Sequence, residues 1–217
     1  MGEVPSLTIN QEVPEEVVLA FEADVVGSLG VPRRQRVYQR SATVPELFQL
    51  LLDAVGWVTL LKGASLYLLY QAGHFIKSFS ETLGEKAGDR VWDGRDEIAR
   101  RLGDAAARPI FVVARALGRA KRSLSPRSRV RVGITVDATD FGAVIDISTS
   151  DDVAIAVLVA TLVLNAEALA EALTLEIGDR RVLGGIRLSV TSRGGILAEW
   201  ADDDGAEHCV EVDPLEP

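Results

Sequence analysis

The sequence predicts an α+β domain, and three observations support that class. Apolar residues alternate with polar ones from Val130 to Val136, which is the period of a half-buried strand. The segment from Val153 to Val163 carries no charged side chain, as expected for a helix that is buried all round. The chain then closes with three short runs separated by turn formers, which predict an antiparallel meander at 186–192, 196–201 and 206–212.

Residues 129–173 read as two strands followed by a long helix. The turn formers of 137–142 join the strands, so we expect an antiparallel hairpin. Ser148–Ser150 offers N-cap hydroxyls, and Asp151 and Asp152 place carboxylates in the first helical turn, where they favour the helix dipole. The uncharged part of the helix is about 18 Å long, against about 30 Å for a hydrocarbon core. These features predict a buried core helix.

The N-terminal region predicts a strand and a helix. Residues 6–11 have strand character, and Pro14 opens a helix with acids in its first turn and Gly30 near its end. Residues 33–40 read as either a basic edge strand or a loop.

The next section reads as helical. Thr43–Glu46 has the pattern of a capping box, and the apolar spacing over 47–79 predicts two helices broken near Lys62. Two more helices are expected at 96–102 and 109–124.

In order, the elements read β-α-(β)-[helical section]-β-β-α-β-β-β. Without the bracketed section, the first six elements follow the β-α-β-β-α-β order of ferredoxin-like folds. We therefore expect an α+β sandwich formed by residues 1–40 and 129–217, with a helical insertion at 41–128 and a C-terminal antiparallel meander.

Charge is segregated along the chain in a way that favours this division. Residues 1–32 carry a net charge of −6, residues 33–131 carry +10, and residues 132–217 carry −13, for a total of −9. A basic middle section between acidic flanks indicates an insertion. The chain has one cysteine and its acidic N-terminus lacks an apolar signal region, so we expect a cytoplasmic protein, peripheral at a membrane if the helical section meets lipid.

Acidic residues are the strongest metal candidates. Asp137, Asp140 and Asp146 could hold Mg²⁺ for phosphoryl transfer, because a hard cation prefers carboxylate oxygens. The first two also fit ordinary turn chemistry. No nucleophile elbow, dinucleotide fingerprint or P-loop accompanies them, so we assign no catalytic residue, no metal and no cofactor.

The C-terminal hairpins contain two further patterns with a structural explanation. Asp202–Glu207 has contiguous acids rather than the alternating acids of a calcium loop, so it reads as a solvated turn. His208 and Cys209 are adjacent on a predicted strand and therefore point to opposite faces.

A run of cations follows the helical section. These side chains could contact the phosphates of lipid or nucleic acid, although the run lacks aromatics for base stacking, so nucleic acid is not expected. The alternative is a solvated helix end, or a surface that pairs with acidic parts of the same chain. The anionic-surface candidates are Arg115, Arg119, Lys121, Arg122 and Arg127.

The segment 54–76 is apolar enough to test against a membrane. Its nine Val, Leu, Ile and Phe residues contribute roughly −3 to −5 kcal/mol toward insertion, and Lys62 offsets about 2.5 to 3.5 kcal/mol of this. A buried helical hairpin and conditional insertion both stay open. The residues expected to contact a partner or a membrane are Trp57, Leu61, Tyr67, Tyr70 and Phe75.

The element order over residues 6–173 resembles that of the small effector-associated adaptor components of bacterial conflict (defence) systems. The resemblance implies an adaptor or effector role and carries no functional residue across. Our first hypothesis is a non-enzymatic adaptor in a bacterial assembly, with a protein partner or a second copy of itself. The alternatives are a membrane-acting effector that inserts the 44–79 helices, and a Mg²⁺-dependent phosphoryl-transfer enzyme.

Overall fold

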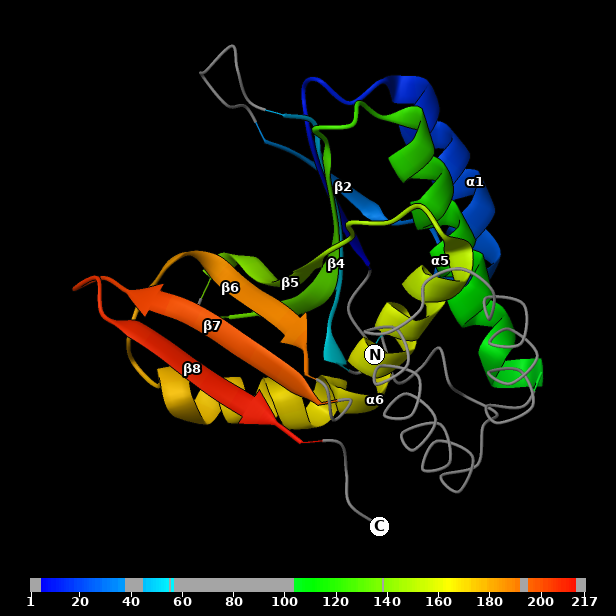
Figure 1. The fold of residues 1–217 in the computed structure, drawn as a ribbon. Helices are drawn as coiled ribbons and strands as arrows, with labels where there is room; N and C mark the ends of the chain where they lie inside the picture. The colour runs from blue at the N-terminus through cyan, green and yellow to red at the C-terminus, as the bar shows by residue number, and fades with distance from the viewer. Residues whose placement is uncertain are drawn as a thin grey trace.

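The computed structural model describes residues 5–37, 45–54, 56, 104–137, 139–191 and 195–213. These residues form one eight-stranded mixed sheet and the helices that cover it (Figure 1), so the α+β class is confirmed. The strands are β1 (Ser6–Asn10), β2 (Arg33–Val37), β3 (Leu47–Leu52), β4 (Arg129–Val136), β5 (Thr139–Asp146), β6 (Val182–Val190), β7 (Ile196–Asp202) and β8 (Glu207–Val212). The helices are α1 (Glu15–Leu29), α5 (Asp104–Ser123) and α6 (Asp152–Ile177).

The strands lie in the order β2-β1-β3-β4-β5-β6-β7-β8. The pairs β1/β2, β3/β4 and β5/β6 are parallel, and every other neighbouring pair is antiparallel. Helix α1 connects β1 to β2, and α6 connects β5 to β6. A ferredoxin-like fold is built from split βαβ units, in which another strand separates the two that a helix joins. Here the joined strands are direct neighbours, so the ferredoxin-like order is not confirmed.

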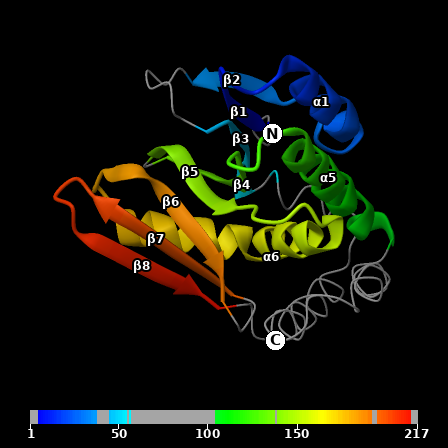
Figure 2. The ribbon, with the colours of Figure 1, turned by 45° about the horizontal axis from the view of Figure 1, so that its top comes forward.

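The apolar core lies between one face of the sheet and the helices. Helix α5 packs between α1 and α6, and α6 extends beneath β6, β7 and β8 (Figure 2). The strands contribute alternate residues to this core, as their period of two requires. One row of cross-strand neighbours consists of the buried side chains Leu7, Leu50, Val132 and Ile145. We call this side of the sheet the helix side and the other the open side.

Several predicted elements are confirmed. The first strand, the helix that starts after Pro14 and ends at Gly30, and the C-terminal meander all form. Residues 33–37 are an edge strand rather than a loop. The hairpin of β4 and β5 also forms, although β5 starts at Thr139, inside the segment 137–142 that the sequence assigns to the turn, because the end of the hairpin pairs through a register shift and Gly142 takes a φ of 65°.

Helix α6 is the buried core helix that the sequence predicts. It is also the one helix among the described residues that is long and apolar enough to cross a membrane, and 61% of its most apolar window is buried in the protein. Its two buried polar side chains are satisfied within the helix, because Thr161 donates to the carbonyl of Val157 and Asn165 to that of Thr161. The sheet and α5 therefore provide the apolar surroundings that this helix requires.

The start of α6 depends on one side chain. Asp151, expected in the first turn, is instead the N-cap, and its Oδ1 accepts the Ala154 N–H at 2.7 Å. Replacing Asp151 with alanine should lower the free energy of unfolding by about 1 kcal/mol, since the N–H then loses its acceptor. Asp151→Asn keeps an acceptor oxygen and should stay within about 0.5 kcal/mol of the wild type. Urea denaturation of both variants checks this, and equal losses would contradict a capping role.

The prediction of a helix that starts at residue 47 is wrong for its first six residues. Residues 47–52 form strand β3 in the middle of the sheet, between β1 and β4. Phe48, Leu50 and Leu52 enter the core, and Leu51 is buried on the open side. The segment is buried on both faces and contains one polar residue, Gln49, so its apolar spacing fits a helix as well as a strand. The capping-box interpretation of Glu46 fails with it, because the Glu46 carboxylate accepts the Ser125 N–H at 2.9 Å.

The described part of 41–128 joins the common core. Strand β3 pairs with β1 and β4, and α5 packs against α1 and α6. Helix α5 covers the helix predicted at 109–124 and begins five residues earlier, with Pro109 inside it. The rest of the helical segment expected over 47–79, the helix expected at 96–102 and the division at 40/41 and 128/129 stay predictions. Residues 57–103 lie outside the described residues.

Candidate functional site

The acidic residues predicted as metal candidates do not converge in the structure. Asp137 is exposed at the turn end of the β4–β5 hairpin, and Asp146 lies at the opposite end of β5, about 20 Å along the strand. Asp146 Oδ1 accepts a hydrogen bond from Arg131 Nε at 2.7 Å. These two carboxylates therefore cannot share one ion. The side chain of Asp140 lies outside the described part, and the residues that are described contain no group of three His, Cys, Asp or Glu placed to hold a metal.

The predicted anionic-surface cluster is partly used inside the protein. Arg119 of α5 lies 2.9 Å from the Asp24 carboxylate of α1, and Arg122 lies 3.1 Å from the Asp152 carboxylate of α6. Lys121 donates to the carbonyl of Ser128 at 2.8 Å. These contacts support the alternative in which the cations pair with acidic parts of the same chain.

Arg115 and Arg127, the other two members of that cluster, carry no ion pair to a described residue. Two cations on their own make a weak phosphate-binding surface, because binding to phosphates increases with the number of charges that are neutralised. The five residues expected to meet a partner or a membrane, Trp57, Leu61, Tyr67, Tyr70 and Phe75, lie outside the described residues.

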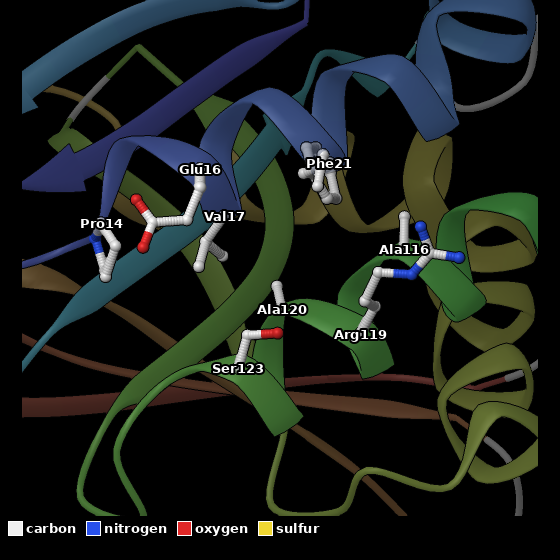
Figure 3. A pocket seen from close by; sticks show the side chains of 9 residues that line it. Pro14, Glu16, Val17, Phe21, Ala116, Arg119, Ala120 and Ser123 are labelled. Atoms are coloured by element: carbon white, nitrogen blue, oxygen red, sulfur yellow. The ribbon is translucent and has the colours of Figure 1, made fainter.

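A shallow cavity lies between α1 and α5 (Figure 3). Its volume of about 180 Å³ is below the roughly 300 to 1,000 Å³ of ordinary ligand pockets. Small side chains account for most of its walls, so it is the space left where two helices pack rather than a shaped site. The lining residues are Pro14, Glu16, Val17, Ala20, Phe21, Ala116, Arg119, Ala120 and Ser123.

The β7–β8 turn contains a carboxylate–imidazole pair. Asp202 accepts hydrogen bonds from His208 Nε2 at 2.8 Å and from the N–H groups of Ala206 and Asp204. The His208 ring stacks on Trp200, with centroids 5.6 Å apart. Cys209 is exposed and lies on the opposite side of the strand from His208, as the sequence predicts. The pair closes the predicted hairpin turn, and the Cys209 thiol, on the other side of β8, does not face it.

This turn should give the protein a pH-dependent stability. Hydrogen bonds from His208 and from the Ala206 and Asp204 N–H groups hold the pKa of Asp202 below its ordinary value. A depressed carboxyl pKa stabilises the fold above the unfolded value of about 3.9, and the contribution is lost as pH falls through the folded pKa.

The Asp202→Asn variant isolates this contribution. Its melting temperature should lie below that of the wild type at pH 7, and the gap should narrow as pH drops below about 4. Asp203→Asn is the matched control, because Asp203 is exposed and its neutralisation removes no such bond. A gap that stays constant from pH 7 to pH 3, measured by thermal melts, would contradict this assignment.

The structure also reveals a surface at the β2 end of the sheet. Strand β2 has β1 on one side and no other described strand on its outer side, and four of its five residues are exposed. Arg34 and Arg36 are held by α1: Glu22 accepts two hydrogen bonds from the Arg34 guanidinium, and Glu15 bridges Arg34 and Arg36, all at 2.5 Å. The two carboxylates raise the pKa of Arg34 above its ordinary value, so Arg34 stays charged.

These ion pairs reveal which stripe of α1 faces the edge. Positions 15, 19, 22 and 26 lie on one side of a helix, because they recur every three or four residues. Since Glu15 and Glu22 contact β2, Leu19 and Val26 lie on that same side, and they are 53% and 47% exposed. An apolar pair at this level of exposure thus borders a strand whose outer side has no described strand as neighbour. We define the β2 edge as residues 33–37 together with Leu19 and Val26.

The opposite end of the sheet has the opposite charge. Strand β8 pairs with β7 and has no described strand on its outer side. Glu207, Cys209 and Glu211 are exposed on it. Sequence reasoning predicted β8 and left 33–40 open between an edge strand and a loop, and it did not predict that the two strands are opposite edges, because only the strand order shows this. The available signal was the segregation of charge along the chain.

Comparison of the chain with protein-family models, with curated proteins and with solved structures yields no match. The assignment of a function therefore rests on the geometry of the described residues.

Proposed function

We propose that the chain is a non-enzymatic interaction component that docks a protein partner by adding a strand to the β2 edge. The observation that carries this proposal is the outer side of β2, on which no described strand pairs and which is bordered by the half-exposed Leu19 and Val26. An unpaired strand presents N–H and C=O groups that an extended segment can bind. Backbone hydrogen bonds supply affinity in this mode, and side chains on alternate positions supply specificity.

The side chains of the edge define the partner. On the open side Arg33 is exposed and takes no described acid as partner, which favours a segment with carboxylates on that side. On the helix side the added strand would lie next to Leu19 and Val26, which favours apolar residues at the alternate positions. The proposal is thus an extended segment that is acidic on one side and apolar on the other.

Site-specific photo-crosslinking tests this function. A benzophenone side chain is placed at Gln35 on the open side of β2, at Leu19 on α1, and at Arg187, which is exposed in the interior of the sheet, as a control. After irradiation in the native cells, Gln35 and Leu19 should crosslink to the same short segment of one protein, and Arg187 should not. Equal crosslinking at Arg187, or none at both test positions, would overturn docking at the β2 edge.

A further inference from the structure

We infer that the occupant of the β2 edge is strand β8 of a second copy, so that chains join head to tail into a continuous sheet. This inference rests on the proposed function and names its partner. Four features of the described residues support it: the face on which each charge lies, the repulsion between like edges, the direction of the two strands, and the apolar residues beside them.

The charges of the two edges lie on the same face. The register of the sheet places one residue of each strand in a single cross-strand row, and all the members of such a row point to one side. One row crosses the whole sheet on its open side: Arg33, Ser6, Leu51, Gly133, Val144, Arg187, Glu199 and Cys209. Glu207 and Glu211 are two residues on either side of Cys209 and share this face. Arg33 at one edge and two glutamates at the other therefore project to the same side.

Like edges repel and unlike edges attract. Two β2 strands would bring together two strands that each carry Arg33, and two β8 strands paired antiparallel about Cys209 would place Glu207 opposite Glu211. Like charges directly opposite each other destabilise a strand pair, and opposite charges stabilise it. The charges thus disfavour a two-fold dimer through either edge, in the way that charged edge strands prevent non-specific pairing. The same charges permit a pairing of β2 with β8.

The directions of β2 and β8 allow the same contact to be repeated from one copy of the chain to the next. Following the parallel and antiparallel pairs across the sheet shows that β2 and β8 run in the same direction. A second copy placed in the same orientation beyond β2 therefore presents β8 as a parallel neighbour. The strands match in length, with 5 residues in β2 and 6 in β8. Such a head-to-tail contact generates an open filament, or a ring if the rotation between copies closes.

The helix side of the junction offers some apolar surface on both partners, Leu19 and Val26 beside the α1-bound Arg34 and Arg36 of β2, and Val210 on β8. The side chains of β8 that alternate with the glutamates are His208, Val210 and Val212, and Val210 is only partly buried by its own chain. In the joined sheet these residues would lie on the side of Leu19 and Val26. Burial of exposed apolar surface adds to the backbone hydrogen bonds. Because a single strand pair is a small interface, we expect association that depends on concentration and weakens in salt.

A reciprocal charge exchange tests the inference. One variant carries Arg33→Glu, and the other carries Glu207→Arg with Glu211→Arg. Wild-type protein should show a mass that rises with concentration to at least about two monomers by light scattering. Each variant alone should stay monomeric, because its edges are alike in charge. An equimolar mixture should associate again, because each variant then meets a complementary edge. Recovery in the mixture is a result that a merely misfolded variant cannot produce.

A disulfide trap at the native cysteine provides a second measurement. Gln35→Cys places a thiol on the open side of β2, the side on which Cys209 lies on β8, and Arg36→Cys places one on the helix side. Oxidised Gln35→Cys should form a ladder of covalent multimers, since the Cα atoms of paired strands are within reach of a disulfide. The wild type has one thiol and can form only dimers, and Arg36→Cys should form a several-fold weaker ladder.

The outcomes separate this inference from the function on which it rests. A wild-type protein that stays monomeric at all concentrations, with equal ladders from Gln35→Cys and Arg36→Cys, would overturn self-assembly. If photo-crosslinks from Gln35 and Leu19 then reach a different protein, the proposed docking at the β2 edge stands without this partner. If those crosslinks are absent as well, the docking itself is wrong.

Discussion

Replacing Gly133 with alanine should unfold the protein or lower its free energy of unfolding by more than about 4 kcal/mol, which is exceptional for one methyl group. A Cβ at this position would overlap the carbonyl oxygen of Ala143 and lie 2.8 Å from both the carbonyl carbon of Ala143 and the Cα of Val144. All these atoms belong to the backbone of β5. That strand is hydrogen-bonded to β4 on one side and β6 on the other, so it cannot move away without breaking one of the pairs.

Gly27→Ala is the matched control for this effect. Gly27 lies inside α1, where an added Cβ meets no atom within 4 Å. The same substitution should therefore stabilise the protein by about 0.5–1 kcal/mol, since alanine has the higher helix propensity. Urea denaturation of both variants measures the free energy of unfolding, which should fall for Gly133→Ala and rise for Gly27→Ala. A Gly133→Ala protein as stable as the wild type would show that β4 and β5 do not approach each other as described.

Phe48→Ala should cost about 3–5 kcal/mol of unfolding free energy. Phe48 is fully buried in β3, and its ring packs edge to face on Phe21 of α1, with centroids 5.0 Å apart. The substitution removes apolar contacts and leaves a cavity that the surrounding strands cannot fill. The pair should also couple: Phe21→Ala with Phe48→Ala should cost about 0.5–1.5 kcal/mol less than the two single losses together.

The control for this prediction is Leu175→Ala, because Leu175 is 76% exposed on α6 and should change stability by no more than about 0.5 kcal/mol. Phe48 is also a test of the fold itself, since it lies in the segment that the sequence assigns to a helix. A loss below about 1 kcal/mol for Phe48→Ala would mean that residues 47–52 do not form a central strand.

Much of the architecture can be predicted from the amino-acid sequence, because the patterns that indicate its strands and helices are local. The alternation in 130–136, the uncharged run of α6 and the turn formers of the meander each indicate an element without reference to the rest of the chain. The interpretation of α6 as a core helix also follows from its length and lack of charge. These are the elements that the structure confirms.

The candidate site could be predicted only in part, because its contacts join residues that are far apart in the sequence. Residues 33–40 were open between strand and loop, and the acids of α1 gave no sign that they would hold Arg34 and Arg36. Arg119 and Asp24, which pair across two helices, are 95 residues apart. The acidic metal candidates Asp137 and Asp146 are close in sequence, yet the hairpin places them at opposite ends.

The sequence by itself determined the class of this protein, its hairpin, its buried helix and its closing meander, since each follows from a local pattern in a single segment: an alternation, an uncharged run or a set of turn formers. Only the tertiary structure decided that 47–52 is a strand, because the apolar spacing of a segment buried on both faces fits a helix as well as a strand. It also decided which strands are the edges, and hence that a basic and an acidic strand face outward at the two ends. Neighbours in a sheet are set by pairing between distant segments, and no local pattern records that order.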